Sequence, residues 1–270
     1  MANKDGMTTK KAPKARMETD LYPPIKQYWE ERGYEVRGEV KHCDLVAIHP
    51  SSPEVPVIIE LKASINLTLI LQGLERMKSS SYVYIAAEKK REGKQSRKRW
   101  RGIEELCRKV GLGLITVTFY TRKKPFVEIH CVPAAETLSE QQDQHALSYA
   151  PVSNPNKTRQ ARLIQEFSGR SGDYNVGGST KRPLVTAYRE RALRVAESLS
   201  QGCSRPVQAK NASGVGDAAQ ILRHNYYGWF KRIERGTYAL TEAGTHALEH
   251  YADVLNALPT SVQSSDHQPS

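Results

Sequence analysis

Three charged residues interrupt two apolar runs of the sequence, and their types could support phosphate chemistry. Asp44 opens the run DLVAI, and Glu60 and Lys62 lie inside the run VIIELK. Side chains alternate between the two faces of a strand, so Glu60 and Lys62 share the face of Ile58. Because a buried charge without a partner is costly, these three groups require one.

A divalent cation is the partner that this set of groups favours. Carboxylate oxygens suit Mg²⁺ or Mn²⁺, so Asp44 and Glu60 would hold the ion and the carbonyl of Leu61 would add a ligand. Lys62 would orient or deprotonate the attacking water, or stabilise the charge of the phosphate. The alternative is that Glu60 and Lys62 form an ordinary surface ion pair.

The elements that must position these residues alternate between helices and strands. Hydrophobic spacing predicts helices over residues 20–32, 67–78 and 96–110, and strands over 34–40, 44–48, 57–63, 82–86, 114–120 and 126–131. The first three strands are close in sequence and should form an antiparallel meander. The result is an α/β fold with a mixed sheet flanked by helices.

Composition divides the chain into five parts. We expect a disordered basic tail over residues 1–16, the α/β domain over 17–133, and a linker and bridging segment over 134–182. Residues 183–258 follow the order helix, helix, helix, hairpin, which is typical of a winged helix-turn-helix domain. In this domain we expect Trp229 or Phe230 to be core. Residues 259–270 should be a second disordered tail.

The D…E-x-K pattern resembles that of the PD-(D/E)xK nuclease superfamily. The runs ETDLYPPIKQYWEERGYEVRGEVKHCDLVAI, IIELKAS, LQGLERM, TAYRERAL, NYYGWFKR and GTYALTEAG resemble a bacterial family of PD-(D/E)xK phosphodiesterases of unassigned biological function. This resemblance covers about residues 17–250. It implies a restriction-endonuclease-like fold over 17–133 and metal-dependent hydrolysis of phosphodiesters.

The resemblance also implies roles for single residues. Asp44, Glu60 and Lys62 match the three signature residues. Many members carry a further acid on the first helix, for which Glu18 is the candidate and Asp20 the neighbour, although either could be a helix N-cap. Gln72 lies where resolvase-like members carry a glutamine, without the aromatic residue that often follows it. Glu39 is expected to be a solvated strand residue, and the alternative is that it joins the metal shell.

The charge balance favours a polyanionic partner. The chain has 40 Lys and Arg against 29 Asp and Glu, which gives a formal net charge of +11. The stretch 88–101, EKKREGKQSRKRWR, is strongly basic and is either a solvated helix face or a surface that tracks phosphates. The candidate contacts to nucleic acid, in both domains, are Lys94, Arg97, Lys98, Arg101, Arg223, Lys231, Arg232 and Arg235.

Other classes of protein fit the sequence poorly. It contains no run of about 20 apolar residues, as a membrane helix requires, and its four separated cysteines form no C-x-x-C pair. We therefore expect a cytoplasmic Mg²⁺- or Mn²⁺-dependent nuclease that acts on double-stranded DNA. The alternatives are a non-catalytic DNA-binding regulator that retains the fold, or an RNA-processing nuclease. A homodimer is compatible with the superfamily, but no residue identifies a dimer face.

Overall fold

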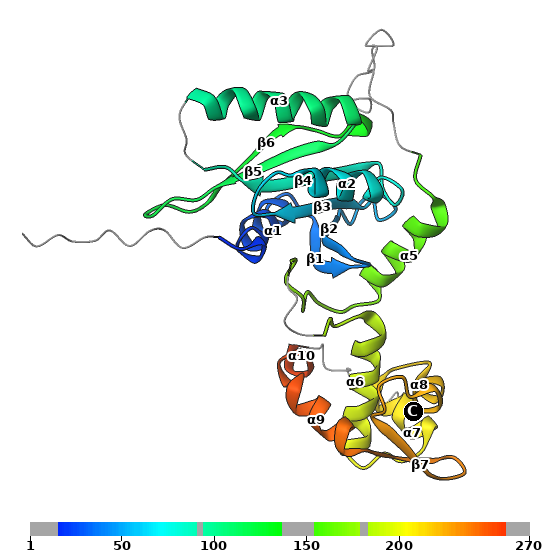
Figure 1. Ribbon diagram of the computed structural model, residues 1–270. Helices are drawn as coiled ribbons and strands as arrows, with labels where there is room; N and C mark the ends of the chain where they lie inside the picture. Colours follow the sequence, from blue (N-terminus) through cyan, green and yellow to red (C-terminus); the bar gives the residue numbers. More distant parts are fainter. Residues whose placement is uncertain (1–15, 91–93, 137–153, 179–182, 258–270) are drawn as a thin grey trace, which may run out of the picture.

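A six-stranded mixed sheet forms the N-terminal part of the computed structural model, which describes residues 16–90, 94–136, 154–178 and 183–257 (Figure 1). The strands are neighbours in chain order, antiparallel from β1 to β3, parallel from β3 to β5 and antiparallel again at β6. Their bounds are β1 (Glu35–Val40), β2 (Cys43–Ile48), β3 (Val57–Lys62), β4 (Tyr82–Glu88), β5 (Gly113–Thr118) and β6 (Phe126–Cys131). The predicted mixed sheet and its antiparallel meander are confirmed.

Helices cover both faces of this sheet. The short 3₁₀ helix η1 (Glu18–Asp20) leads into α1 (Tyr22–Glu30), whose Ile25 and Trp29 pack with Ile59 and Leu61 on one face. On the other face lie α2 (Leu67–Arg76), α3 (Lys94–Val110) and α5 (Lys157–Ser168), packed against the side of the sheet that carries Ile58. The alternation of strand side chains thus separates two hydrophobic layers, and the face with α2 is the one toward which Glu60 points.

Helix α5 lies inside the segment that the sequence suggested was linker and bridge. Its residues Leu163 and Phe167 are buried in the hydrophobic layer on the α2 side of the sheet, and Asn156 caps its first turn. The sequence did not single out this helix, because α5 needs only a narrow apolar stripe to cover the edge near β1. The tails predicted over 1–16 and 259–270 and the linker stretch 137–153 lie outside the described residues, apart from Arg16.

The C-terminal part is a helical unit with a hairpin and its own core. It comprises α6 (Ala187–Ser200), α7 (Pro206–Ser213), α8 (Ala218–His224), β7 (Phe230–Glu234), β8 (Thr237–Leu240), α9 (Glu242–His250) and α10 (Ala252–Ala257). The expected order of three helices and a hairpin is present. Trp229 and Phe230 are both buried in its core, as expected of at least one of them.

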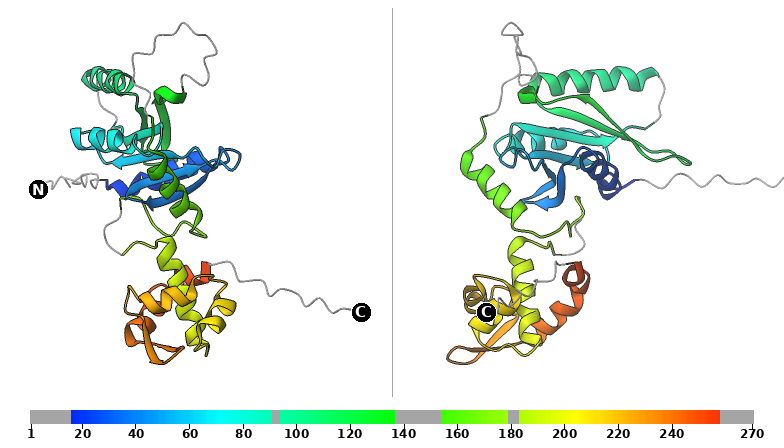
Figure 2. Two further views of the ribbon diagram at one scale, coloured as in Figure 1. Left: turned by 90° about the vertical axis from the view of Figure 1, so that its right-hand side faces the viewer. Right: turned by 180° about the vertical axis from the view of Figure 1, so that it is seen from behind.

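This unit lies on the side of the sheet where β1 forms the edge, as the views in Figures 1 and 2 agree, and polar contacts join the two. Arg170 is buried and donates to the carbonyl oxygens of Gly38 and Glu39, at 2.9 and 2.8 Å. The neighbouring Ser171 nitrogen donates to the carboxylate of Glu190 on α6, at 2.8 Å. Because these bonds satisfy buried backbone groups, they hold residues 170–178 against β1. None of the helices in the described ranges is long and apolar enough to cross a bilayer.

Candidate active site

The pairing of β2 and β3 brings Asp44 and Glu60 together. Leu45 is paired with Ile59 in this antiparallel ladder, so Asp44 and Glu60 follow as cross-strand neighbours on the α2 face. The backbone nitrogen of Leu61 donates to Oδ2 of Asp44 at 2.8 Å. The amide nitrogen of Leu61 is thus in direct contact with the predicted site, and a ligand role for its carbonyl stays a prediction.

The Glu60 side chain has no exposed surface, and one of its two carboxylate oxygens has a hydrogen-bond partner. Its Oε1 atom accepts a hydrogen bond from Nε of Arg76 on α2 at 2.6 Å. Its Oε2 atom is buried and has no hydrogen-bond partner among the described residues. Burial, followed by the charge of Asp44, raises the pKa of Glu60 to about 7. Burial also raises the pKa of Asp44, against the lowering effect of its bond from Leu61.

Lys62 lies at the end of β3 and pairs with Glu18. The Nζ atom of Lys62 is 3.0 Å from Oε1 of Glu18, and both side chains are partly exposed. Glu18 lies in η1, just before the first α-helix, where the family resemblance places a further acid. The capping role instead belongs to Asp20, whose Oδ2 accepts from the Met17 nitrogen at 2.9 Å. Asp44, Glu60, Lys62 and Glu18 thus form one group of interacting charges.

A segment that is remote in sequence closes this group from the β1 side. A Cβ atom on Gly177 would lie 2.4 Å from the carbonyl oxygen of Asp44, so only glycine fits there. The nitrogen of Gly178 donates to Oε1 of Glu39 at 2.8 Å. Glu39 lies in β1, as predicted, but it is half-buried rather than solvated and has a left-handed φ of 54°. Its charge contributes to the raised pKa of Glu60.

Arg76 is the functional candidate that sequence reasoning missed. It is an ion-pair partner of Glu60, and it also donates to the carbonyl oxygen of His42 beside Asp44. The available signal was helical spacing, since Arg76 follows Gln72 by one turn and therefore shares its face. Gln72 itself lies on α2 with a buried Oε1 atom that has no hydrogen-bond partner in the described part of the chain.

The residues present fit a divalent cation, although the acidic set is small. Within the described ranges, no three His, Cys, Asp or Glu side chains converge into a metal-binding group. Mg²⁺ needs only one or two protein carboxylates, because waters and substrate phosphate complete its shell. The unpartnered Oε2 atom of Glu60 and the neighbouring carboxylate of Asp44 meet that requirement. A cation here would also offset the mutual repulsion that raises the pKa of Glu60.

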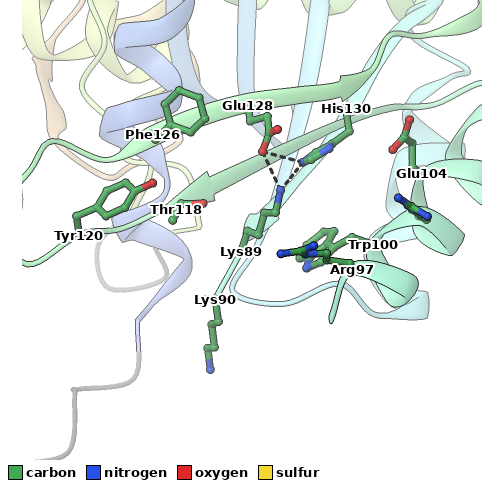
Figure 3. Close-up of a pocket in the computed structure, with 11 residues that line it drawn as sticks. Lys89, Lys90, Arg97, Trp100, Glu104, Thr118, Tyr120, Phe126, Glu128 and His130 are labelled. Carbon is green, nitrogen blue, oxygen red and sulfur yellow. Dashed lines mark hydrogen bonds and ion pairs between the residues drawn. The ribbon is translucent and has the colours of Figure 1, made fainter. Parts of the chain in front are cut away.

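The predicted nucleic-acid contacts lie on two separate surfaces. Arg97 and Arg101 on α3 line a pocket of about 540 Å³ beside β5 and β6, which Figure 3 shows. Lys98 is exposed and is not among the residues that line it. Lys94 is the first residue of α3, and its side chain lies outside the described set. The residues of the second surface are all exposed and lie on α8 and the β7–β8 hairpin: Arg223, Lys231, Arg232 and Arg235.

Replacing Glu60 with glutamine should stabilise the metal-free protein at pH 8. Glutamine keeps an oxygen for Arg76 but removes a buried charge. A pKa raised from 4.5 to about 7 corresponds to roughly 3 kcal/mol, so we expect a gain of about 1–3 kcal/mol in the free energy of unfolding. The folded protein binds this proton more tightly than the unfolded chain, so the wild type loses this stability as pH rises from about 4.5 to about 7.

Urea denaturation in EDTA at pH 8 and pH 5 measures this effect. At pH 5 most of the folded protein carries a neutral Glu60, so the gain should fall below about 1 kcal/mol. Glu105→Gln is the matched control, because Glu105 is exposed on α3 and pairs only with Lys109 among the described residues. A Glu60→Gln variant less stable than the wild type at pH 8 would contradict the expectation.

Comparison with known proteins gives a match to one family model. It matches no curated protein and no solved structure. A family model does match residues 115–247, from within β5 to within α9, and its description is "Putative PD-(D/E)XK phosphodiesterase (DUF2161)". The strands that carry Asp44, Glu60 and Lys62 precede the matched segment. Over residues 115–247 the match agrees with the family resemblance that the sequence predicted.

Proposed function

We propose that the protein is a metal-dependent nuclease that hydrolyses phosphodiester bonds of DNA. The observation that carries the proposal is Glu60, a fully buried carboxylate with one unpartnered oxygen, beside Asp44 and two residues before Lys62. A protein that needed only stability would gain by replacing such a group, since an uncompensated buried charge is destabilising. The family description supports the same class of reaction.

Each residue then has a definite task. Asp44 and Glu60 would hold Mg²⁺ or Mn²⁺, and the bound ion supplies an activated water and a polarised phosphate. The bond from Leu61 fixes the orientation of the Asp44 carboxylate. Arg76 fixes that of Glu60 through Oε1, which leaves Oε2 for the ion. Lys62 would hold the proton removed from water or stabilise the phosphate charge. The ion pair with Glu18 keeps the ammonium group of Lys62 at the rim of the site.

The cationic surfaces would hold the substrate. Lys94, Arg97, Lys98 and Arg101 on α3 would contact the backbone near the site, and the helical unit would bind duplex DNA as a winged helix. In that arrangement Arg223 on α8 and the hairpin residues Lys231, Arg232 and Arg235 meet phosphates. Their exposure supports this assignment, because exposed cations on a helix and an adjacent hairpin can reach one duplex.

The ion pair between Arg76 and Glu60 favours a second candidate function. A guanidinium group already neutralises part of the carboxylate to which the metal would bind. A chain that needs no metal could keep this pair and act as a non-catalytic DNA-binding regulator. The positive charge suits RNA equally well, so RNA processing is the third candidate.

A cleavage assay with three substrates separates these functions. The full chain should cut duplex or branched DNA in Mg²⁺ or Mn²⁺ and not in EDTA. Glu60→Gln should lower the rate by at least about 100-fold, whereas the matched control Glu105→Gln should keep it. Calorimetry should show Mn²⁺ binding that Glu60→Gln abolishes. Equal rates in the wild type and Glu60→Gln would refute the nuclease, binding without cleavage or Mn²⁺ uptake would identify the regulator, and cleavage confined to structured RNA would identify the third candidate.

A further inference from the structure

A pocket lies on the same face of the sheet as the candidate active site. Strand pairing aligns Lys62 on β3 with Ala87, Ala87 with Thr116 and Thr116 with Glu128 on β6. These four side chains form one row, so Glu128 lies three strand spacings from Lys62, roughly 14 Å. Glu128 and Lys89, which follows β4, line the pocket of about 540 Å³ (Figure 3).

The acidic groups of this pocket are neutralised, and its outer cations are not. Glu128 pairs with Lys89 at 2.8 Å, and Glu104 pairs with Arg108 at 2.8 Å. By contrast, the structure records no acidic partner within the described ranges for the pocket residues Lys90, Arg97 and Arg101. The pocket therefore presents uncompensated positive charge, which suits the phosphates of a polyanion.

Aromatic rings form two opposite sides of the same pocket. Trp100 on α3 stacks on His130, with ring centroids 6.2 Å apart and planes 15° apart. Across the pocket lie Tyr120 and Phe126, and Phe126 is 54% exposed (Figure 3). An exposed phenylalanine at the first position of a strand contributes little to the core, whereas a flat ring beside arginines can stack on a base.

We propose that this pocket binds an unpaired nucleotide of the strand whose phosphodiester lies at the Asp44–Glu60–Lys62 site. The inference rests on the proposed function. The base would lie among Phe126, Tyr120 and Trp100, and Arg97 and Arg101 would contact the adjacent phosphates. The volume suits a small ligand such as one nucleotide, and a base held in a duplex cannot present its face to these rings. The substrate is thus DNA with an unpaired stretch, and the helical unit holds the duplex beside it.

Fluorescence anisotropy in EDTA tests the pocket without any cleavage. The probes are an oligothymidylate of about 12 nucleotides, within the range of known single-strand sites, and a blunt duplex of the same length. Phe126→Ala should weaken binding of the single strand at least about fivefold, which is the lower end for loss of one stacked base. Duplex binding should change less than about twofold.

Two arginines on one helix provide the matched comparison. Arg97→Ala should lower the slope of log K against log salt by about 0.7 for the single strand. Arg99→Ala removes the same charge from the opposite side of α3, outside the pocket lining, and should leave the slope unchanged. Equal effects of these two substitutions, or equal losses of single-strand and duplex binding in Phe126→Ala, would overturn the proposal.

The outcome is separable from that of the nuclease assay. Binding through the pocket in a protein that never cuts DNA would refute the proposed nuclease and leave the pocket assigned. If the protein cleaved DNA with metal while Phe126→Ala and Arg97→Ala bound single strands like the wild type, the nuclease would stand and the pocket proposal would be overturned.

Discussion

Replacing Lys62 with alanine should lower the rate of metal-dependent DNA cleavage by at least about 100-fold, the lower end for loss of a positioned acid–base group. The Nζ atom of Lys62 is held 3.0 Å from Glu18, and Lys62 lies on the same strand face as Glu60. Binding of uncut DNA in EDTA should change less than about twofold, because one rim charge contributes little to a large phosphate interface. Single-turnover cleavage and anisotropy measure the two effects.

A structural role for Lys62 predicts a different pattern. The ion pair with Glu18 is partly exposed, so its loss should cost under about 1 kcal/mol of folding stability. Lys109→Ala is the matched control, since Lys109 also pairs with a glutamate but lies on α3 with both side chains exposed. If Lys62→Ala cleaved DNA at the rate of Lys109→Ala, the residue would have no part in the reaction.

Replacing Arg76 with leucine should destabilise the protein by about 3–5 kcal/mol at pH 8, the range for a buried ion pair deprived of one partner. Glu60 has no exposed surface, and Arg76 is its ion-pair partner. Arg76 holds down the pKa of Glu60, so its removal should raise that pKa further. The loss of stability should therefore shrink at pH 5, where Glu60 takes up a proton and carries no charge. Chemical denaturation at both pH values measures it.

Two further variants distinguish the charge effect from lost packing. Arg159→Leu removes an arginine from an exposed pair with Glu75, and it should cost under about 1 kcal/mol at either pH. Adding Glu60→Leu to Arg76→Leu removes the unpaired charge, so most of the stability at pH 8 should return. If the double variant stayed as unstable as Arg76→Leu, packing and the bond to the His42 carbonyl would explain the loss instead.

Local patterns were enough to predict the strands and their charged residues. Two apolar runs that include Asp44, Glu60 and Lys62 indicated buried strands. Because unpaired buried charges are costly, these residues also indicated a site in which the charges have a partner. The alternation along a strand predicted that Glu60 shares the face of Ile58, and the β2–β3 register agrees. These predictions succeeded because the period of a strand is fixed by its backbone geometry.

Contacts between distant segments could not be predicted in the same way. Arg76 is 16 residues from Glu60 along the chain, and Gly178 is 139 residues from the Glu39 side chain that it binds. Helical spacing puts Arg76 on the face of Gln72, but no local pattern links either pair, because an ion pair or an amide–carboxylate bond requires only that two groups meet in space. Helix α5 was missed for a related reason, since its narrow apolar stripe is meaningful only against the edge that it covers.

The sequence by itself determined which residue types occupy the strands, the positive charge and the family model that residues 115–247 match. Only the tertiary structure decided which oxygen of Glu60 lacks a hydrogen-bond partner among the described residues, and that Arg76 is the ion-pair partner of Glu60. It also decided which arginines line the pocket beside β6. The physical reason is that burial and charge pairing depend on every element packed around a group. Strand period and composition depend on neighbours along the chain alone.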